Sequence, residues 1–282
     1  MTQSEQAPPG RLAFAELMHQ PEDTIALSEA ALLIAKEEYP DLDVDAYRGR
    51  LERMAADVAR ALGTAADPHR ILAGLNEYLF VRQGFRGNAE NYYDPKNSFL
   101  NDVLDRRLGI PITLSLLYID VGSRLGLPLY GIGMPGHFLV KYAGRDEEVI
   151  IDPYGKGSFV SDGDCQRILD QVFGGSVRYD RGMLAVVGTR QILSRMLTNL
   201  KAIYIKSGAY CKALATIDRL LILDASAVGE IRDRALVLFQ MKRQAEAGSE
   251  LERYLRLQPS APDSEILRGH LRRLRQRAVA LN

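Results

Sequence analysis

Two polar residues, His137 and Asp152, stand out in a largely apolar stretch of the chain. An imidazole held by a carboxylate supplies the base and the orienting group of a nucleophile–base–orienter triad, because the carboxylate fixes which ring nitrogen carries the proton. If residues 143–146 form a hairpin loop, the two face each other on antiparallel strands with Cβ atoms about 5 Å apart. A slip of one residue would send them to opposite faces. The spacing therefore predicts a His–Asp pair.

The residues before this pair predict the helix on which a nucleophile would lie. Gly109–Pro111 marks a helix start, because proline at the first helical position has a preset φ and gives up an N–H that needs no partner. A thiol there would become more acidic in the field of the helix dipole, but no cysteine occurs near this position. The helix is expected to end at Gly126. Strands are then expected at 129–134, 137–142 and 148–152.

Other residues could complete or support the site. Thr113 lies in the first helical turn, but a hydroxyl lacks the acidity of a thiol and needs a well-aligned base. Cys165 follows the His and the Asp in the chain, and Cys211 is expected to be a packing residue in the helical tail. Asn101 and Pro111 are expected to support the loop or to line the cleft. Histidine and cysteine spacing indicates no metal site, and no cofactor is predicted.

The pair itself has two interpretations. In the first, His137 and Asp152 are a base and its orienting carboxylate. In the second, they are a buried hydrogen bond that pins two strands together, since buried polar groups are normally paired in folded proteins. The residues alone leave both interpretations open.

Composition narrows the class of protein. The 282 residues include 36 Lys and Arg against 36 Asp and Glu, and this zero net charge argues against bulk capture of nucleic acid or of an anionic membrane. The arginine-rich stretch 268–277 is interpreted as the solvated face of a terminal helix. Two cysteines exclude a disulfide framework. The first residues lack a signal-peptide pattern, and the apolar run 110–122 is too short to span a bilayer, so a cytoplasmic protein is expected.

The first part of the chain is predicted to be helical. Residues 1–10 are polar and contain proline, which indicates a disordered lead-in. Helix signals then continue to residue 107, interrupted by a loop over 84–98 that is rich in Gly, Asn and Asp. The expected N-caps are Asp23 or Thr24, Asp43 and Asp67, and the aromatic residues Phe85, Tyr92 and Tyr93 are expected to pack the loop down.

From residue 189 onward the chain is helical and repeats itself. A shift of 34 residues aligns Ala213 with Ala247 and Leu220 with Tyr254. This helix–turn–helix period, with a proline after the second helix, resembles the tetratricopeptide repeat. The second unit lacks the turn glycine, and a helix over 264–279 is expected to cap the pair. The concave surface of such repeats commonly holds a segment of another protein, although two repeats could also merely cap the core.

The helix and the runs Gly126–Pro128, Gly136–His137 and Asp152–Pro153 resemble the transglutaminase-like superfamily. Its papain-like core has a cysteine at a helix start, a histidine on a strand and an aspartate on the next strand. Counting back from Gly126 places that cysteine at Pro111. A longer set of segments is similar to the SirB-like family, a bacterial group that has proline at the same position. Those segments are Glu37–Pro40, Gly84–Asn88, Tyr92–Pro95, Gly109–Ile112 and Pro135–Phe138.

The resemblance covers residues 20–275 and implies an α+β protein. It implies a transglutaminase-like domain over 11–188, with a helical part (11–107) and a helix-plus-strands core (108–188), followed by a tetratricopeptide-like tail (189–282). With proline in place of the cysteine, it implies a catalytically inactive or altered domain that binds protein or peptide. The alternative is a hydrolase or an acyl or amide transferase in which His137 activates water or a hydroxyl. A third hypothesis is a regulatory subunit whose cleft holds a small ligand.

Overall fold

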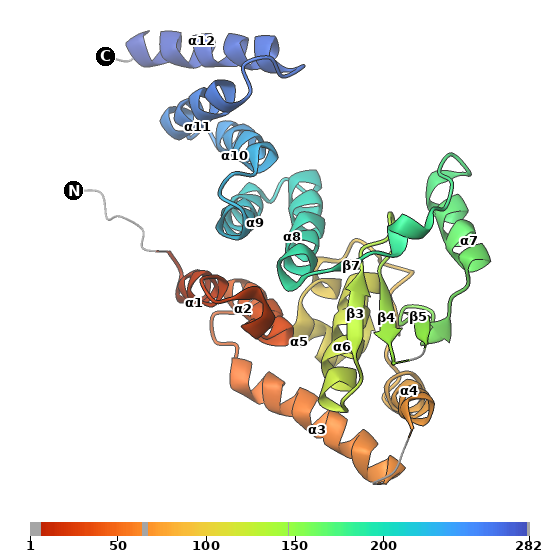
Figure 1. Cartoon of the computed structure of the whole chain (residues 1–282). Coiled ribbons are helices and arrows are strands. Elements are labelled where there is room, and N and C mark those ends of the chain that lie inside the picture. Colours follow the sequence, from red (N-terminus) through yellow and green to blue (C-terminus); the bar gives the residue numbers. More distant parts are fainter. Residues whose placement is uncertain (1–6, 64–66, 146, 281–282) are drawn as a thin grey trace. The chain divides into compact units, whose positions relative to one another are not determined.

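The computed structural model describes residues 7–63, 67–145 and 147–280, and Figure 1 shows the elements in chain order. The chain divides into two compact units between Met196 and Leu197. The first helix, α1 (Pro9–Met18), begins inside the stretch that was expected to be disordered, because Pro9 occupies the first helical turn. Residues 1–6 of that stretch lie outside the described residues. Among the described residues, no helix is long and apolar enough to cross a membrane.

Helices form the N-terminal part of the first unit. The Asp43 side chain accepts the N–H of Ala46 (2.9 Å) and caps α3 (Val44–Leu62), and Asp67 accepts that of Arg70 (3.0 Å) and caps α4 (Pro68–Asn76). Both predicted caps are confirmed. The elements are η1 (Glu22–Thr24), α2 (Leu27–Glu38), α3 (Val44–Leu62), α4 (Pro68–Asn76) and the π-helical turn η2 (Glu77–Arg82).

The predicted cap at Asp23 or Thr24 is wrong. Both residues lie in η1, where the Thr24 hydroxyl donates to the carbonyl of Pro21 (2.8 Å). Ile25 and Ala26 are extended, so the chain straightens before α2 begins at Leu27 without a side-chain cap. The hydroxyl closes the short turn and is therefore not available to cap the helix that follows.

The loop over 84–98 is only partly packed as expected. Phe85 is buried, but Tyr92 and Tyr93 are 37% and 67% exposed. The side chains that hold the loop are instead the buried amides of Asn88 and Asn97, which bond each other (3.0 Å). The loop contains β1 (Arg86–Gly87), which pairs in parallel with β2 (Leu108–Gly109), and the 3₁₀ turn η3 (Pro95–Asn97), and it is followed by α5 (Leu100–Arg106).

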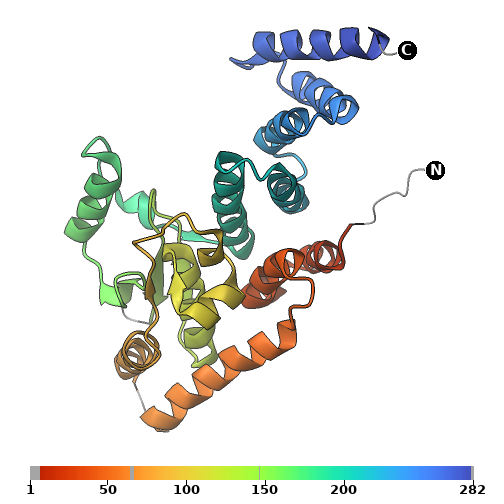
Figure 2. The same cartoon turned by 180° about the vertical axis from the view of Figure 1, so that it is seen from behind.

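Helix α6 (Pro111–Arg124) begins at the predicted proline and packs on β3 (Leu129–Ile132) and β4 (Leu139–Ala143) of an antiparallel sheet. In Figure 2, α6 lies between the viewer and these strands. On the other face, Cys165 and Leu169 of α7 pack with Leu139 in a buried cluster. The sheet order is β6-β5-β4-β3-β7, with β3 (Leu129–Ile132), β4 (Leu139–Ala143), β5 (Glu148–Asp152), β6 (Ser158–Phe159) and β7 (Val186–Val187), while α7 (Asp162–Phe173) and η4 (Arg181–Leu184) lie between β6 and β7 in the chain.

The hairpin register differs from the expected one by two residues. The expected loop at 143–146 would pair Lys141 with Glu148, whereas Lys141 pairs with Ile150 and Ala143 with Glu148. Strand β4 continues through Ala143, so the turn starts one residue later than the loop that was expected around Gly144. Because the side-chain period of a strand is two residues, this shift leaves every side chain on its predicted face.

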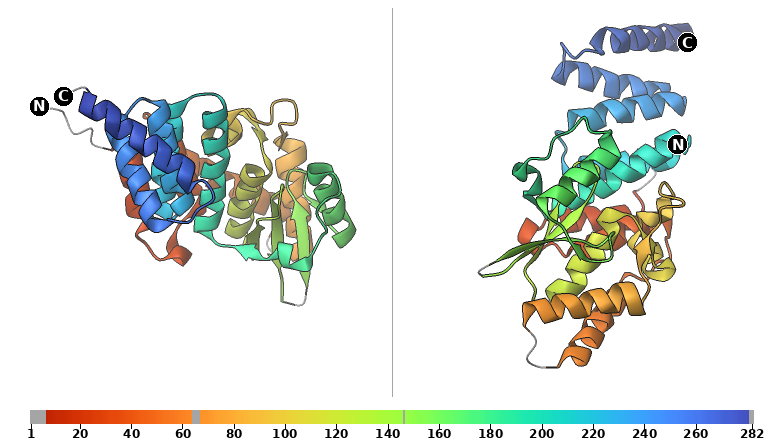
Figure 3. Two further views of the ribbon diagram at one scale, coloured as in Figure 1. Left: turned by 90° about the horizontal axis from the view of Figure 1, so that it is seen from above. Right: turned by 90° about the vertical axis from the view of Figure 1, so that its right-hand side faces the viewer.

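The tail consists of paired helices with the expected period. Helix α9 (Tyr210–Leu223) and α11 (Gln244–Leu257) start and end 34 residues apart. The aligned Ala213 and Ala247 are both fully buried, as the small residues at a helix crossing must be. Lys242 takes the left-handed conformation (φ 60°) where Gly208 has φ 71°. The other helices are α8 (Thr189–Lys206), α10 (Val228–Gln240) and α12 (Ser264–Ala280), and α9 to α12 follow one another in Figure 3.

Candidate functional site

His137 and Asp152 are neighbours in the folded chain. The Nε2 atom of His137 lies 3.0 Å from Oδ1 of Asp152, and the side chains are only 11% and 13% exposed. His137 lies in the turn before β4, where its N–H donates to the carbonyl of Met134 (3.1 Å). The turn requires Gly136, whose φ is 73°. The two residues of the sequence-predicted pair therefore meet, although His137 precedes the strand that was expected to carry it.

The contact is electrostatic and is not an aligned hydrogen bond. The Oδ1 atom of Asp152 accepts the N–H of Tyr154 (2.9 Å), which fixes the carboxylate over the turn after β5. Nε2 of His137 is buried, and among the described residues it has no hydrogen-bond partner with acceptable geometry. A proton on Nε2 is therefore not aligned with the carboxylate oxygen that lies nearest to it. The pair needs a small rotation before the carboxylate can orient the imidazole as a base.

Tyr154 packs against the imidazole of His137, a role that the sequence analysis did not predict. Its ring meets that of His137 edge to face, with centroids 5.9 Å apart and planes at 86°. The tyrosine also lies on the backbone of Gly87, where an added Cβ would come within 2.3 Å of the ring. Gly87 thus makes room for Tyr154, and Tyr154 in turn positions His137. The glycine in the loop was the available signal, but its partner is remote in the sequence.

The start of α6 offers no free nucleophile among the residues considered. Pro111 is buried at the first helical position. The Thr113 hydroxyl is fully buried, donates to the carbonyl of Asn97 (2.8 Å) and accepts the N–H of Ile110 (3.1 Å). Ser115 donates to the carbonyl of Phe138 (3.3 Å). Both hydroxyls therefore join α6 to neighbouring backbone and are not directed at a substrate position.

The remaining sequence candidates lie in different surroundings. Asn101 is 6% exposed on α5, and its Oδ1 has no hydrogen-bond partner in the described part of the chain. Cys165 is fully buried, and burial is the main cause that raises the pKa of its thiol, so it stays protonated at neutral pH. Cys211 is exposed near the start of α9. Among the described residues, no group of three or more His, Cys, Asp or Glu could hold a metal ion.

An asparagine network that sequence reasoning missed joins the loop over 84–98 to the start of α6. The Asn97 side chain donates to the carbonyl of Asn91 (2.8 Å), and the Asn88 N–H donates to the carbonyl of Gly109 (2.9 Å). Each amide uses donor and acceptor groups inside the loop, so the backbone between them is fixed. Tyr92, which lies within this loop, is thereby held in a defined position. The high density of asparagine was the signal that could have predicted the network.

Arg195 is a further residue that the sequence analysis missed, because it was assigned to the tail. From α8, its Nη2 donates to the carbonyl of His137 (2.7 Å), and its guanidinium carbon lies 5.5 Å from the centroid of the Phe138 ring. Burial lowers the pKa of Arg195, and the nearby Tyr92 partly offsets this. Burial also raises the pKa of Tyr92 and of Tyr154, so both phenols remain protonated donors at neutral pH.

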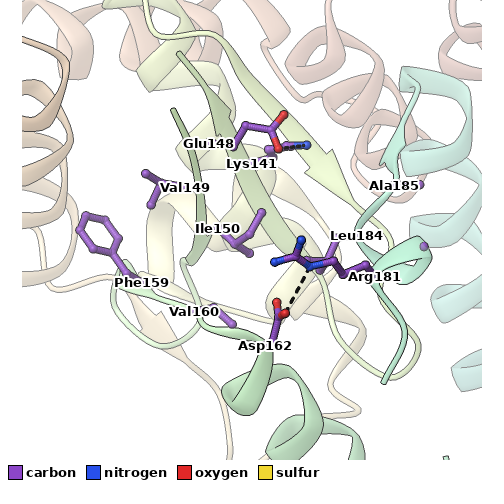
Figure 4. Close-up of a pocket in the computed structure, with 11 residues that line it drawn as sticks. Lys141, Glu148, Val149, Ile150, Phe159, Val160, Asp162, Arg181, Leu184 and Ala185 are labelled. Carbon is purple, nitrogen blue, oxygen red and sulfur yellow. Dashed lines mark hydrogen bonds and ion pairs between the residues drawn. The ribbon is translucent and has the colours of Figure 1, made fainter. Parts of the chain in front are cut away.

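A separate pocket of about 500 Å³ lies on the α7 side of β4 and β5. Figure 4 shows that its charged residues form two internal pairs, Lys141 with Glu148 (2.7 Å) and Arg181 with Asp162 (3.3 Å). Because these charges neutralise each other, the pocket presents no unsatisfied charge to a ligand. Its apolar lining residues include Val149, Ile150, Phe159, Val160 and Leu184.

An antiparallel sheet backed by α6, a His–Asp pair at the strand ends and a 34-residue helical repeat define a transglutaminase-like domain joined to tetratricopeptide repeats. The model of the transglutaminase-like superfamily matches residues 45–198, and that of the tetratricopeptide repeat matches residues 200–272. Both architectural predictions are confirmed. No solved structure matches the chain.

Similar proteins identify the family to which the chain belongs. A UPF0162 protein of Xylella fastidiosa (strain 9a5c) is 36% identical over 253 residues, which cover 89% of this chain and 90% of the relative. One from Vibrio cholerae is 29% identical over 253 residues, covering 89% and 93%. This chain belongs to the UPF0162 family. Human F-box only protein 21 is 31% identical over 147 residues, 49% of this chain and 22% of that protein. The SirB-like assignment stays a prediction.

Proposed function

We propose that this protein is a regulatory module that binds protein or peptide segments through a transglutaminase-like domain without cysteine chemistry. The observation that carries the proposal is the start of α6. There the superfamily's cysteine position is Pro111, and the nearest hydroxyl, that of Thr113, is committed to Ile110 and Asn97. With no free nucleophile at this point among the described residues, the geometry around His137 is better suited to holding a ligand than to covalent catalysis.

The tail supports a binding role. Tetratricopeptide repeats generally mediate interactions between proteins. Large apolar side chains are exposed on the tail, and exposed apolar groups are typical of interaction surfaces when they gather on one face. They include Ile205 (38%), Leu257 (50%) and Ile266 (64%).

Site-specific crosslinking in living cells tests this proposal. A photoreactive phenylalanine derivative replaces Ile266 on α12 or Leu257 on α11 in the full chain, and Val81, which is 68% exposed on η2, serves as the matched control position. We expect defined protein adducts from the tail positions that are absent from the control position. Adducts no more abundant than those of the control would overturn a partner-binding role for the tail.

A second candidate function is hydrolysis or acyl transfer, and the 3.0 Å contact between His137 and Asp152 favours it. In this reaction, His137 would take a proton from water, and Asp152 would stabilise the imidazolium. A panel of activated esters and peptide amides, turned over by the full chain, tests it. If the chain is such an enzyme, His137→Ala should lower the rate of turnover by about a hundredfold or more, which is the usual contribution of a general base. Equal rates in the unchanged chain and in His137→Ala would rule it out.

A further inference from the structure

Arg195 is held in place by the segment that carries His137. Besides the bond from Nη2 to the His137 carbonyl (2.7 Å), its Nη1 comes within 3.4 Å of where a Cβ on Gly133 would lie. The guanidinium also lies over the ring of Phe138 (5.5 Å). The bond to the His137 carbonyl and the contact with the Phe138 ring therefore hold the cation in place, and a fixed guanidinium loses little freedom when it binds a ligand.

The charge of Arg195 is not balanced by any described carboxylate. Within residues 7–63, 67–145 and 147–280, no carboxylate is paired with Arg195, and Tyr92 is the one acidic group that acts on it electrostatically. Other half-buried arginines of the same unit are paired, such as Arg106 with Asp94 (2.8 Å). A cation that is largely removed from water without a partner costs free energy, and the cation–π contact with Phe138 offsets only part of this cost.

Groups around Arg195 are suited to an anionic ligand. The Tyr92 phenol is 37% exposed, and its O–H is a donor that can share the ligand's oxygen with the guanidinium. Tyr92 also lies edge to face with Tyr93, 5.3 Å between centroids, so an aromatic surface borders the cation. In the pocket of Figure 4, by contrast, both cations already have carboxylate partners. Arg195 is therefore the better candidate for recognising an acid.

We propose that Arg195 and Tyr92 form a carboxylate-binding subsite beside His137, and that the segment bound by this domain presents a carboxylate there. The inference rests on the proposed binding function and names the chemistry of its ligand. The carboxylate is either the C-terminus of a chain or an Asp or Glu side chain. One cation and one phenol match a single negative charge, whereas phosphate sites in proteins generally gather several cations.

Nuclear magnetic resonance of the full chain can observe the site directly. The probe is sodium acetate, with sodium chloride at equal ionic strength as the reference, and the signal is the arginine Nε–Hε resonance assigned by Arg195→Lys. We expect the Arg195 resonance to shift to saturation with acetate and not with chloride. Arg60, which is exposed and paired with Asp57, is the internal control and is expected not to saturate.

Two variants keep the test valid if one of them fails to fold. Arg195→Lys retains the charge and loses the planar fork, and Tyr92→Phe removes one hydroxyl. We expect acetate affinity to fall about tenfold or more for Arg195→Lys and roughly twofold to tenfold for Tyr92→Phe, as for a charged and a neutral hydrogen bond. Unchanged affinity in both variants would contradict the assignment.

Short acetylated glycine peptides separate the two sources of the carboxylate. A peptide with a free C-terminus, its amide, and an amide with one internal Glu are titrated in parallel. Saturation by the free acid alone assigns a C-terminus, and saturation by the Glu peptide assigns a side chain; either supports the subsite. Saturation by inorganic phosphate but not by acetate overturns it, as does no saturation by any probe. The crosslinking at Ile266 is independent of these results, so failure of the subsite and failure of the binding function can be told apart.

Discussion

Two basic side chains of α8, Arg195 and Lys201, are treated in opposite ways by the fold. Lys201 is 9% exposed, and its Nζ bonds Glu230 (2.7 Å) and Asp233 (2.7 Å) of α10. Arg195 bonds one carbonyl and has no carboxylate partner among the described residues. A buried cation with two carboxylates is a structural element, because removing any member leaves the others uncompensated. A half-buried cation without such a partner, like Arg195, can bind an external acid. The difference separates a charge used for folding from a charge available for binding.

The largest expected effect is on Lys201. Lys201→Met should lower the free energy of unfolding by about 2–3 kcal/mol, below the roughly 3–5 kcal/mol of a fully buried pair, because Glu230 and Asp233 keep some contact with water. Denaturant titration of the full chain measures it. A loss below about 0.5 kcal/mol, typical of a surface pair, would remove the distinction between the two cations.

The same cluster should respond to alkaline pH. Burial acts to lower the pKa of Lys201, but the bonds to Asp233 and Glu230 outweigh it and raise that pKa above 10.5. The stabilisation is therefore fully present below the ordinary lysine pKa and is lost as the pH rises through the raised value. The stability gap between wild type and Lys201→Met should stay constant from about pH 7 to pH 9 and narrow above about pH 10.5. A gap that narrows already near pH 8 would contradict this assignment.

The packing of the Tyr154 ring beside His137 can be tested at Gly87. Gly87→Ala places a Cβ against Tyr154 and should cost about 1–3 kcal/mol, as overpacked cores do, while shifting the His137 ring resonances. Gly163→Ala in α7 is the matched control, since the nearest atom lies 3.8 Å from the added Cβ. If the His137 resonances stay unchanged in Gly87→Ala, Tyr154 does not position the imidazole.

A smaller effect is expected at the repeat turn of the tail. Lys242 holds a left-handed φ of 60° that a residue with a side chain adopts at a cost of about 1 kcal/mol, so Lys242→Gly should stabilise the tail by about that amount. Thermal unfolding of the full chain measures the gain. Gly208→Lys, at the equivalent position of the first repeat, should lose a similar amount. A loss in Lys242→Gly would show that the lysine side chain contributes more than its backbone strain removes.

The smallest expected change in stability is that of Arg195→Met. Removing an uncompensated cation should alter the free energy of unfolding by less than about 1 kcal/mol in either direction, because a desolvated charge and one hydrogen bond are lost together. Arg60→Met provides the exposed reference. A loss of unfolding free energy as large as that of Lys201→Met would mean that Arg195 stabilises the fold in the same way as Lys201. The two cations would then not differ in role.

Local signals explain which features the sequence could predict. Pro111, Asp43 and Asp67 act within a few residues of their own position, so the helix starts they mark are where pattern reasoning placed them. The His137–Asp152 contact survived a wrong hairpin register because the shift was even. The Asp23 or Thr24 cap failed because a short turn used the hydroxyl first.

Remote contacts explain what the sequence could not predict. Arg195 meets His137 across 58 positions of the chain, and Tyr154 meets Gly87 across a similar distance. Nothing in the residues around Arg195 distinguishes it from a surface arginine of an amphipathic helix. Its role depends on His137 and Phe138, which are remote in the sequence and lie beside Arg195 only in the folded chain.

The proline at the start of α6 also affects how readily this part of the domain can be oxidised. A thiolate at such a helix start is the group that peroxides convert first to sulfenic acid and then irreversibly to higher acids. Pro111 has no corresponding reaction, and Cys165, the cysteine of the same unit, is fully buried as a thiol. At the start of α6, therefore, the described residues offer no thiol to a peroxide.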